Sequence, residues 1–106
     1  MKRIVIRGGE VFDSIGGTAS IADIAVEGER IVDVGTSLDG DEAIDAAGHA
    51  VYPGFIDSHV HFMVDGDLDP MQSVHTPFST NFYLAAERMA RTLAAGITTV
   101  REAGGS

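Results

Sequence analysis

The amino-terminal half of the chain alternates short apolar runs with glycines and charged residues. The runs are rich in β-branched residues and cover positions 3–7, 10–12, 21–26 and 30–34. Runs of this length between glycines predict strands, because glycine provides the tight turns that connect them. Residues 27–30 separate the last two runs by a short turn and predict a hairpin. Residues 1–52 are therefore expected to form a small β-sandwich subdomain or an incomplete one.

The carboxyl-terminal half shows a different order of patterns. Residues 53–62 read PGFIDSHVHF and predict a strand that ends at two histidines. Residues 63–77 show no clear period and predict a loop. Apolar residues then recur at the spacing of a helix, at Phe78, Phe82, Ala85, Ala86, Met89 and Leu93.

The predicted helix carries signals at both of its ends. Thr76 is a candidate N-cap, Pro77 suits the first helical position, and Gly96 supplies the stop. Residues 97–100 then predict a second β-branched strand. Strand, loop, helix and strand in residues 53–106 predict one βαβ unit, whose parallel strands end at the same edge of the sheet.

The two histidines at the end of the first of these strands are the main chemical signal. In a strand successive side chains point to opposite faces, so Asp57, His59 and His61 are expected to share one face. The Cα atoms of the two histidines would lie about 6.6 Å apart. Their side chains can close that gap on one ion at Zn–N distances of roughly 2.0–2.1 Å, which makes the pair half of a metal site.

The same pair also has a simpler interpretation. A His-x-His pair in a strand is often an exposed polar face, and a motif match alone is a hypothesis. Here the pair closes an apolar strand, which is where α/β enzymes place their catalytic residues. This position favours the metal site.

The loop after the histidines contains two further candidates. Residues 65–69, Asp-Gly-Asp-Leu-Asp, do not fit a calcium loop, because Pro70 stands where glycine is required and Thr76 where glutamate is required. They predict an acidic rim at the mouth of the site. His75 is a candidate for substrate contact, although a single loop histidine is more often merely solvated.

Composition narrows the classes of partner. The chain of 106 residues has a formal net charge of −9 with its acidic residues spread out, and Lys2 is its only lysine. Nucleic acids and anionic membranes require clustered Lys and Arg, so neither is expected as a partner. A signal-peptide core and a membrane-spanning run of about 18 apolar residues are not found, which makes a cytoplasmic location the default expectation.

Three segments together resemble a known family. The string PGFIDSHVHF resembles the first barrel strand of the amidohydrolase superfamily, which consists of metal-dependent hydrolases built on a TIM barrel. Residues 44–52 are similar to the lead-in of that strand, and residues 92–105 to its second strand. The last segment most resembles the imidazolonepropionase-like and Xaa-Pro dipeptidase-like branch, in which an Asp usually stands at the position of Glu102.

The resemblance implies a fold and a reaction. The fold would be α/β, the amino-terminal part of a TIM barrel with its first βαβ unit in residues 53–106, truncated relative to the family and preceded by the β-sandwich subdomain. The reaction would be hydrolysis of amide-type C–N bonds in a small-molecule or dipeptide-like substrate, using Zn²⁺ as one or two divalent ions. His59 and His61 would be metal ligands, and Asp57 would tune them as a neighbour.

Arg101 and Glu102, which end the second strand, are substrate-binding candidates. Arg101 could hold a substrate carboxylate, and Glu102 could orient Arg101 or a water at the metal. A plain surface ion pair is an equal alternative for the two.

Two hypotheses on the chain as a whole remain open. The first is the amino-terminal portion of an amidohydrolase, inactive alone and completed by a missing carboxyl-terminal portion or by other copies in a homo-oligomer. The second is a small non-catalytic module for binding or oligomerisation, derived from an amidohydrolase. The intact histidine pair favours the first.

Overall fold

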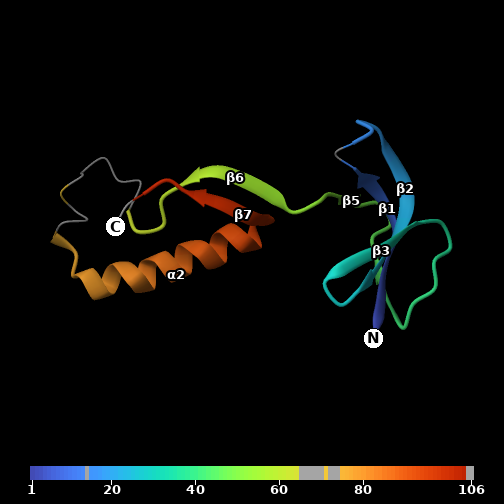
Figure 1. Ribbon diagram of the computed structural model, residues 1–106, viewed down its shortest axis with the longest axis horizontal. Coiled ribbons are helices and arrows are strands. Elements are labelled where there is room, and N and C mark those ends of the chain that lie inside the picture. Colours follow the sequence, from blue (N-terminus) through green and yellow to red (C-terminus); the bar gives the residue numbers. More distant parts are fainter. Residues whose placement is uncertain (14, 65–70, 72–74, 105–106) are drawn as a thin grey trace. The chain divides into compact units, whose positions relative to one another are not determined.

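The computed structural model describes residues 1–13, 15–64, 71 and 75–104 of the chain. It divides into two compact units, Met1–Pro53 and Gly54–Ser106 (Figure 1). Each unit has its own sheet, so each is described by itself.

The first unit consists of one mixed five-stranded sheet. Its strands are β1 (Arg3–Phe12), β2 (Ala19–Glu27), β3 (Arg30–Gly35), β4 (Glu42–Asp45) and β5 (Ala50–Val51). The order is β3-β2-β1-β4, with β5 also beside β1; β1, β2 and β3 pair antiparallel, whereas β4 and β5 run parallel to β1. The predicted hairpin at residues 27–30 joins β2 to β3. A sandwich needs two facing sheets, and the described strands of this unit form one sheet.

The two strands predicted at 3–7 and 10–12 are a single strand with a bulge. Ile6 pairs with Ile24 and Gly9 with Ala22, so β1 has one residue more than β2 in this interval. Gly8 has a φ of +70°, a left-handed conformation that glycine adopts without a Cβ clash. The glycines therefore bend a continuous strand, where we expected them to end one.

A buried carboxylate connects this bulge to the loop after β3. Asp23 is 6% exposed. Its Oδ1 accepts the Gly8 N–H at 2.9 Å and its Oδ2 accepts the Leu38 N–H at 3.1 Å. The bond from Gly8 is the largest cause that lowers the pKa of Asp23; burial opposes it, and the Leu38 N–H and the Arg7 guanidinium lower it further.

The loop bonded to Asp23 covers one face of the sheet. The connection from β3 to β4 must pass β2 and β1, because β3 and β4 lie on opposite sides of that pair. Within it, the Leu38 carbonyl accepts a bond from Arg7 Nη2 at 3.0 Å. Gly40 lies close to Val5: a Cβ on Gly40 would be 2.6 Å from Val5 Cγ2. Val5 is completely buried. Val5 is therefore buried beneath the loop, and Ile24, which the register places on the opposite face, is also buried.

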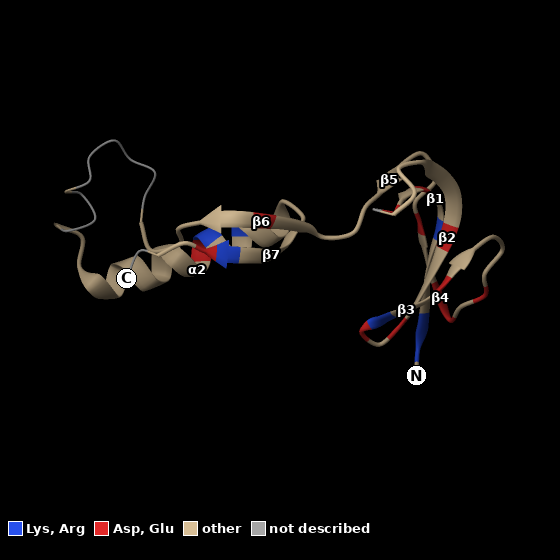
Figure 2. Cartoon of the chain, turned by 45° about the horizontal axis from the view of Figure 1, so that its top comes forward, with Lys and Arg blue, Asp and Glu red and all other residues tan. Residues whose placement is uncertain are grey.

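The other face of the sheet remains largely exposed. The register places Ile31, Val34 and Ile44 on the face opposite Val5, and they are 66%, 54% and 55% exposed. Figure 2 shows basic residues of this unit beside acidic ones. Arg3 Nε bonds Glu27 Oε1 at 2.7 Å, and Lys2 pairs with Glu42. Ile31, Val34 and Ile44 thus make part of this face apolar and exposed.

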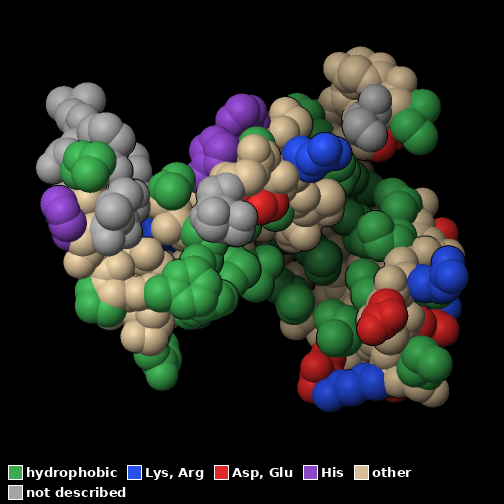
Figure 3. Space-filling view, turned by 60° about the vertical axis from the view of Figure 1, so that its left-hand side comes forward, with side chains coloured by type: hydrophobic (Ala, Val, Ile, Leu, Met, Phe, Trp, Pro, Cys, Tyr) green, Lys and Arg blue, Asp and Glu red, His purple; other side chains and the backbone are tan. Residues whose placement is uncertain are grey.

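The second unit is a βαβ unit, as expected. It contains β6 (Phe55–Val60), α2 (Phe78–Ala94) and β7 (Ile97–Glu102), and β6 and β7 pair parallel as a two-stranded sheet (Figure 1). Ala85 is buried, whereas Phe78, Phe82 and other large apolar residues of the helix are exposed, and hydrophobic side chains reach the surface in several places (Figure 3). We interpreted these apolar positions as packing residues, but among the described residues of α2 only Ala85 is buried. No helix in the described part of the chain is long and apolar enough to span a bilayer.

The two ends of α2 differ in how well they were predicted. Gly96, with a φ of +89°, follows the helix as expected and donates its N–H to the Leu93 carbonyl at 2.9 Å. The N-cap position belongs to Pro77 and not to Thr76, so the predicted start is one residue too early. Pro77 has a ψ of 134°, which is not helical, and its carbonyl accepts the Thr80 N–H at 2.9 Å.

Asp23→Asn is expected to lower the stability of the chain at neutral pH and to reduce its sensitivity to acid. A folded-state pKa below the unfolded value of about 3.9 stabilises the fold above that value. This stabilisation is lost as the pH falls from about 4 through the lower folded pKa. Urea midpoints from circular dichroism at pH 7 and in this acid range measure both effects. Asp33→Asn, at an exposed position of β3, is the control, and equal acid sensitivity in Asp23→Asn and the wild type would contradict the prediction.

Candidate metal centre

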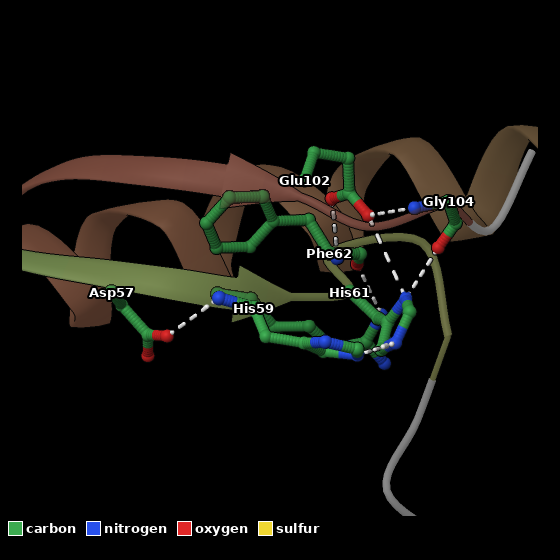
Figure 4. A network of polar contacts seen from close by, with 7 residues as sticks. Asp57, His59, His61, Phe62, Glu102 and Gly104 are labelled. Carbon is green, nitrogen blue, oxygen red and sulfur yellow. Dashed lines mark hydrogen bonds and ion pairs between the residues drawn. The ribbon is translucent and has the colours of Figure 1, made fainter.

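Two imidazoles meet where β6 ends. The Nε2 atoms of His59 and His61 are 3.0 Å apart, with ring centroids 4.9 Å apart and ring planes at 78° (Figure 4). Both residues are exposed, and histidine side chains are visible on the molecular surface in Figure 3. The predicted convergence of the two rings is confirmed.

β6 is irregular at the residues that lead to the two histidines. Asp57 pairs with Val100 and Val60 with Glu102, so β6 contains one residue more than β7 in this interval. Bulges of this kind redirect side chains and are frequent beside active sites. Asp57 Oδ1 accepts the backbone N–H of His59 at 3.0 Å within the bulge. The contact of Asp57 is therefore with the backbone that carries His59, whereas we expected it to tune the imidazoles.

The other nitrogen of His61 faces β7. Its Nδ1 contacts the Gly104 carbonyl and lies 3.7 Å from Glu102 Oε1. Glu102 also accepts two backbone N–H groups, that of Phe62 at 3.0 Å and that of Gly104 at 3.2 Å (Figure 4). One carboxylate thus connects the segment after β6 to the segment after β7.

This geometry fits two ligands of one metal ion. At Zn–N distances of roughly 2.0–2.1 Å, two nitrogens 3.0 Å apart subtend an angle of about 90° at the ion. Neutral imidazole nitrogen is a common ligand for zinc and other divalent metals. A zinc site needs at least three protein ligands, and no group of three His, Asp or Glu side chains able to hold an ion occurs among the described residues. The described residues therefore fit two ligands, which is fewer than a zinc site needs.

The remaining candidates are placed as follows. Arg101 is exposed, and Glu102 forms no ion pair with it within the described part of the chain, because neighbouring residues of a strand point to opposite faces. The substrate roles of Arg101 and Glu102 stay predictions. His75 is exposed and donates its backbone N–H to the Met71 carbonyl at 3.1 Å. The predicted acidic rim, residues 65–69, lies outside the described residues.

Arg88 was not identified from the sequence as a residue that contacts the segment after β6. This half-buried residue of α2 donates from Nη1 to the Phe62 carbonyl at 2.8 Å and lines a groove of about 580 Å³ beside the end of β6. Arg88 follows the buried Ala85 by three positions, so both lie on one face of the helix. A charged residue on the buried face was the available signal.

Comparison with known proteins identifies the family. Residues 50–106 match the Amidohydrolase family. The chain belongs to this family.

Individual relatives differ in activity. Adenine deaminase 1 of Rhizobium meliloti (strain 1021) is 48% identical over 58 residues, which cover 55% of this chain and 10% of the enzyme. N-acyl-D-glutamate deacylase of Alcaligenes xylosoxydans xylosoxydans is 45% identical over 60 residues, which cover 55% of this chain and 12% of the enzyme. The chain thus spans about a tenth of the length of these two relatives.

Solved structures resemble nearly the whole chain. A prolidase complexed with N-methylphosphonate-L-proline has a TM-score of 0.86 at 32% identity, covering 98% of this chain and 26% of the prolidase. A Xaa-Pro dipeptidase with bound methionine has a TM-score of 0.82 at 27% identity, covering 98% of this chain and 27% of the dipeptidase. A D-aminoacylase with a binuclear metal centre has a TM-score of 0.64 at 32% identity, covering 92% of this chain and 17% of the enzyme. The expected fold class, a β-rich subdomain followed by the first part of a TIM-barrel hydrolase, is confirmed.

Replacing both histidines by alanine is expected to weaken Zn²⁺ binding by the chain at least tenfold. Among the described residues, the imidazoles of His59 and His61 are the two nitrogen ligands that converge. Binding of one ion by both rings requires a lone pair on each Nε2. Titration with Zn²⁺, followed by calorimetry, measures the dissociation constant. His49→Ala removes an exposed histidine of the first unit and is the matched control. Equal affinity of the double variant and the wild type would exclude a metal site at His59 and His61.

Proposed function

We propose that this chain contributes to a metal-dependent hydrolase that cleaves amide-type C–N bonds. The observation that carries the proposal is the 3.0 Å approach of two imidazole Nε2 atoms at the end of a barrel strand in a member of the amidohydrolase family. Active sites of TIM-barrel enzymes lie at this end of the strands. The proposal assigns His59 and His61 as ligands of Zn²⁺, in a centre of one or two divalent ions.

The residues around the pair have distinct parts in this proposal. When bound, a divalent metal would polarise the substrate carbonyl and make a water molecule more acidic. His59 and His61 would hold the metal. Asp57 would fix the backbone at His59 through its bond to the N–H. The proton-transferring group is not assigned to any residue of this chain.

The names of the relatives support a small substrate with an amide bond. A dipeptidase, a D-aminoacylase and an N-acyl-D-glutamate deacylase are named for reactions at such bonds. Their substrates, by these names, are amino-acid derivatives. We therefore propose N-acyl amino acids or Xaa-Pro dipeptides as the substrate class.

Arg101 is our candidate for recognition of the substrate carboxylate. It lies in β7 one residue before the strand ends, it is exposed, and no described residue forms a hydrogen bond or ion pair with its guanidinium. A guanidinium that no described residue binds can form a bidentate pair with a carboxylate. His75, also exposed, is the second candidate for substrate contact.

A non-catalytic module is the second candidate function. It is favoured by the exposed apolar side chains Ile31, Val34 and Ile44, which a second copy of the chain or another polypeptide could cover. Such a module needs no metal. Metal-dependent turnover therefore separates the two candidates.

The deciding assay compares the 106-residue chain with a polypeptide whose reading frame extends beyond Ser106. With Zn²⁺ present, we expect hydrolysis of N-acyl amino acids or Xaa-Pro dipeptides by the extended polypeptide and none by the chain alone, because two ligands do not complete a zinc site. The activity should disappear in His59→Ala. Turnover that persists in His59→Ala and His61→Ala, or an extended polypeptide that binds no metal, would contradict the proposal.

Arg101→Met in the extended polypeptide is expected to lower kcat/KM for substrates with a carboxylate by about 10- to 100-fold. A charged hydrogen bond contributes roughly 1.5–3 kcal/mol, and methionine keeps the length of the side chain without its donors. Substrates whose carboxylate is replaced by an amide should lose much less. Arg30→Met, at an exposed position of β3 in the first unit, is the control. An equal loss for both kinds of substrate would rule out carboxylate recognition.

A further inference from the structure

The geometry points to Glu102 and Gly104 as positioning residues for His61. We propose that they hold the imidazole of His61 with its proton on Nδ1, so that Nε2 keeps a lone pair directed at His59. This inference rests on the proposed function, because His61 is a ligand only within that proposal. It assigns Glu102 a role different from the substrate contact expected from the sequence.

Glu102 extends the pairing of the two strands beyond their backbone bonds. The Ala103 N–H donates to the Val60 carbonyl at 2.9 Å at the point where β6 ends. Phe62, two residues after Val60, donates its N–H to Glu102 Oε2 at 3.0 Å. The side-chain carboxylate thus takes the place of a backbone carbonyl as the acceptor. The residues on both sides of His61 are thus fixed to the end of β7.

Gly104 supplies the acceptor for the imidazole. Its φ is +107°, a conformation that residues with a Cβ rarely adopt. Its N–H donates to Glu102 Oε1 at 3.2 Å, and its carbonyl contacts His61 Nδ1. A Cβ at this position would meet nothing within 4 Å, so a substitution acts on the backbone conformation and not through a steric clash.

The acceptor determines which nitrogen of His61 carries the proton. A carbonyl oxygen only accepts hydrogen bonds, so Nδ1 must be the donor, and the carboxylate 3.7 Å away favours the same arrangement. A neutral imidazole has one N–H, which leaves Nε2 unprotonated. That nitrogen lies 3.0 Å from His59 Nε2, and an ion shared by the two rings requires a lone pair on each of these nitrogens.

The test uses Glu102→Gln and Gly104→Ala in the 106-residue chain. Glutamine keeps the shape but replaces one acceptor oxygen with a donor, and alanine disfavours the backbone conformation of Gly104. We expect each variant to weaken Zn²⁺ binding by about 10-fold or more, since partners of metal-bound histidines typically contribute 10- to 100-fold. We also expect the ring ¹⁵N chemical shifts of His61 in the metal-free chain to show a loss of the form protonated at Nδ1.

Two matched controls separate this effect from general destabilisation. Gly48→Ala changes another glycine with positive φ, +76°, where a Cβ also meets nothing within 4 Å. Glu87→Gln changes an exposed carboxylate of α2. Both are expected to leave Zn²⁺ affinity and the His61 ring shifts unchanged. If Gly104→Ala disturbs the amide signals of β6 and β7, Glu102→Gln decides the test.

The outcomes distinguish the inference from the function on which it rests. If His61→Ala does not weaken Zn²⁺ binding, the proposed metal site is wrong. If His61→Ala weakens binding while Glu102→Gln retains both the wild-type affinity and the wild-type ring shifts, the positioning role is wrong and the metal site stands. Loss of affinity together with a changed proton position in Glu102→Gln supports the inference.

Discussion

The parallel pairing of β6 with β7 is the constraint on which the candidate site depends. It places residues 57–62 beside residues 100–104, about 40 positions away in the sequence, and the site consists of contacts between these segments. Pairing alone would leave two exposed histidines at the end of a strand. The backbone bond from Ala103 to Val60 and the carboxylate of Glu102, which accepts the Phe62 N–H, hold the residues on the two sides of His61.

Carboxylates replace backbone acceptors at an interrupted strand pairing in each unit. Asp23 accepts an N–H at the bulge of β1 and another from the loop after β3, and Glu102 does the same where β6 and β7 end. Their environments differ, since Asp23 is 6% exposed and the Glu102 side chain is 43% exposed. Hydrogen bonds and ion pairs in solvent contribute little free energy, so the role of Glu102 is to position its partners. The buried Asp23 instead holds the loop that lies over Val5.

The features that follow from the regular spacing of residues along the chain could be predicted from the sequence. The alternation of a strand predicted that the imidazoles of His59 and His61 meet, and apolar spacing with Gly96 predicted the helix and its end. Features that depend on a partner segment could not. Nothing in Gly8-Gly9 alone distinguishes a bulge from a turn, because the difference is whether β2 continues alongside. The contact of Gly104 with His61 likewise depends on the register of β6 against β7, which no local pattern specifies.

Among the described residues of the second unit, few apolar side chains are buried and no third side chain joins the two imidazoles, which has a thermodynamic consequence for the proposed metal site. Parallel strands are normally covered on both faces, yet Phe55 is 52% and Ile56 73% exposed, and a two-stranded sheet with one helix buries little apolar area. In the proposed site, zinc ligands beyond His59 and His61 would come from segments that approach the same strand ends. A segment that covers these strands and carries such ligands would bury apolar surface and coordinate the ion together. Metal binding and the ordering of this unit are then linked, because each additional ligand that binds the ion also stabilises the packing that delivers it.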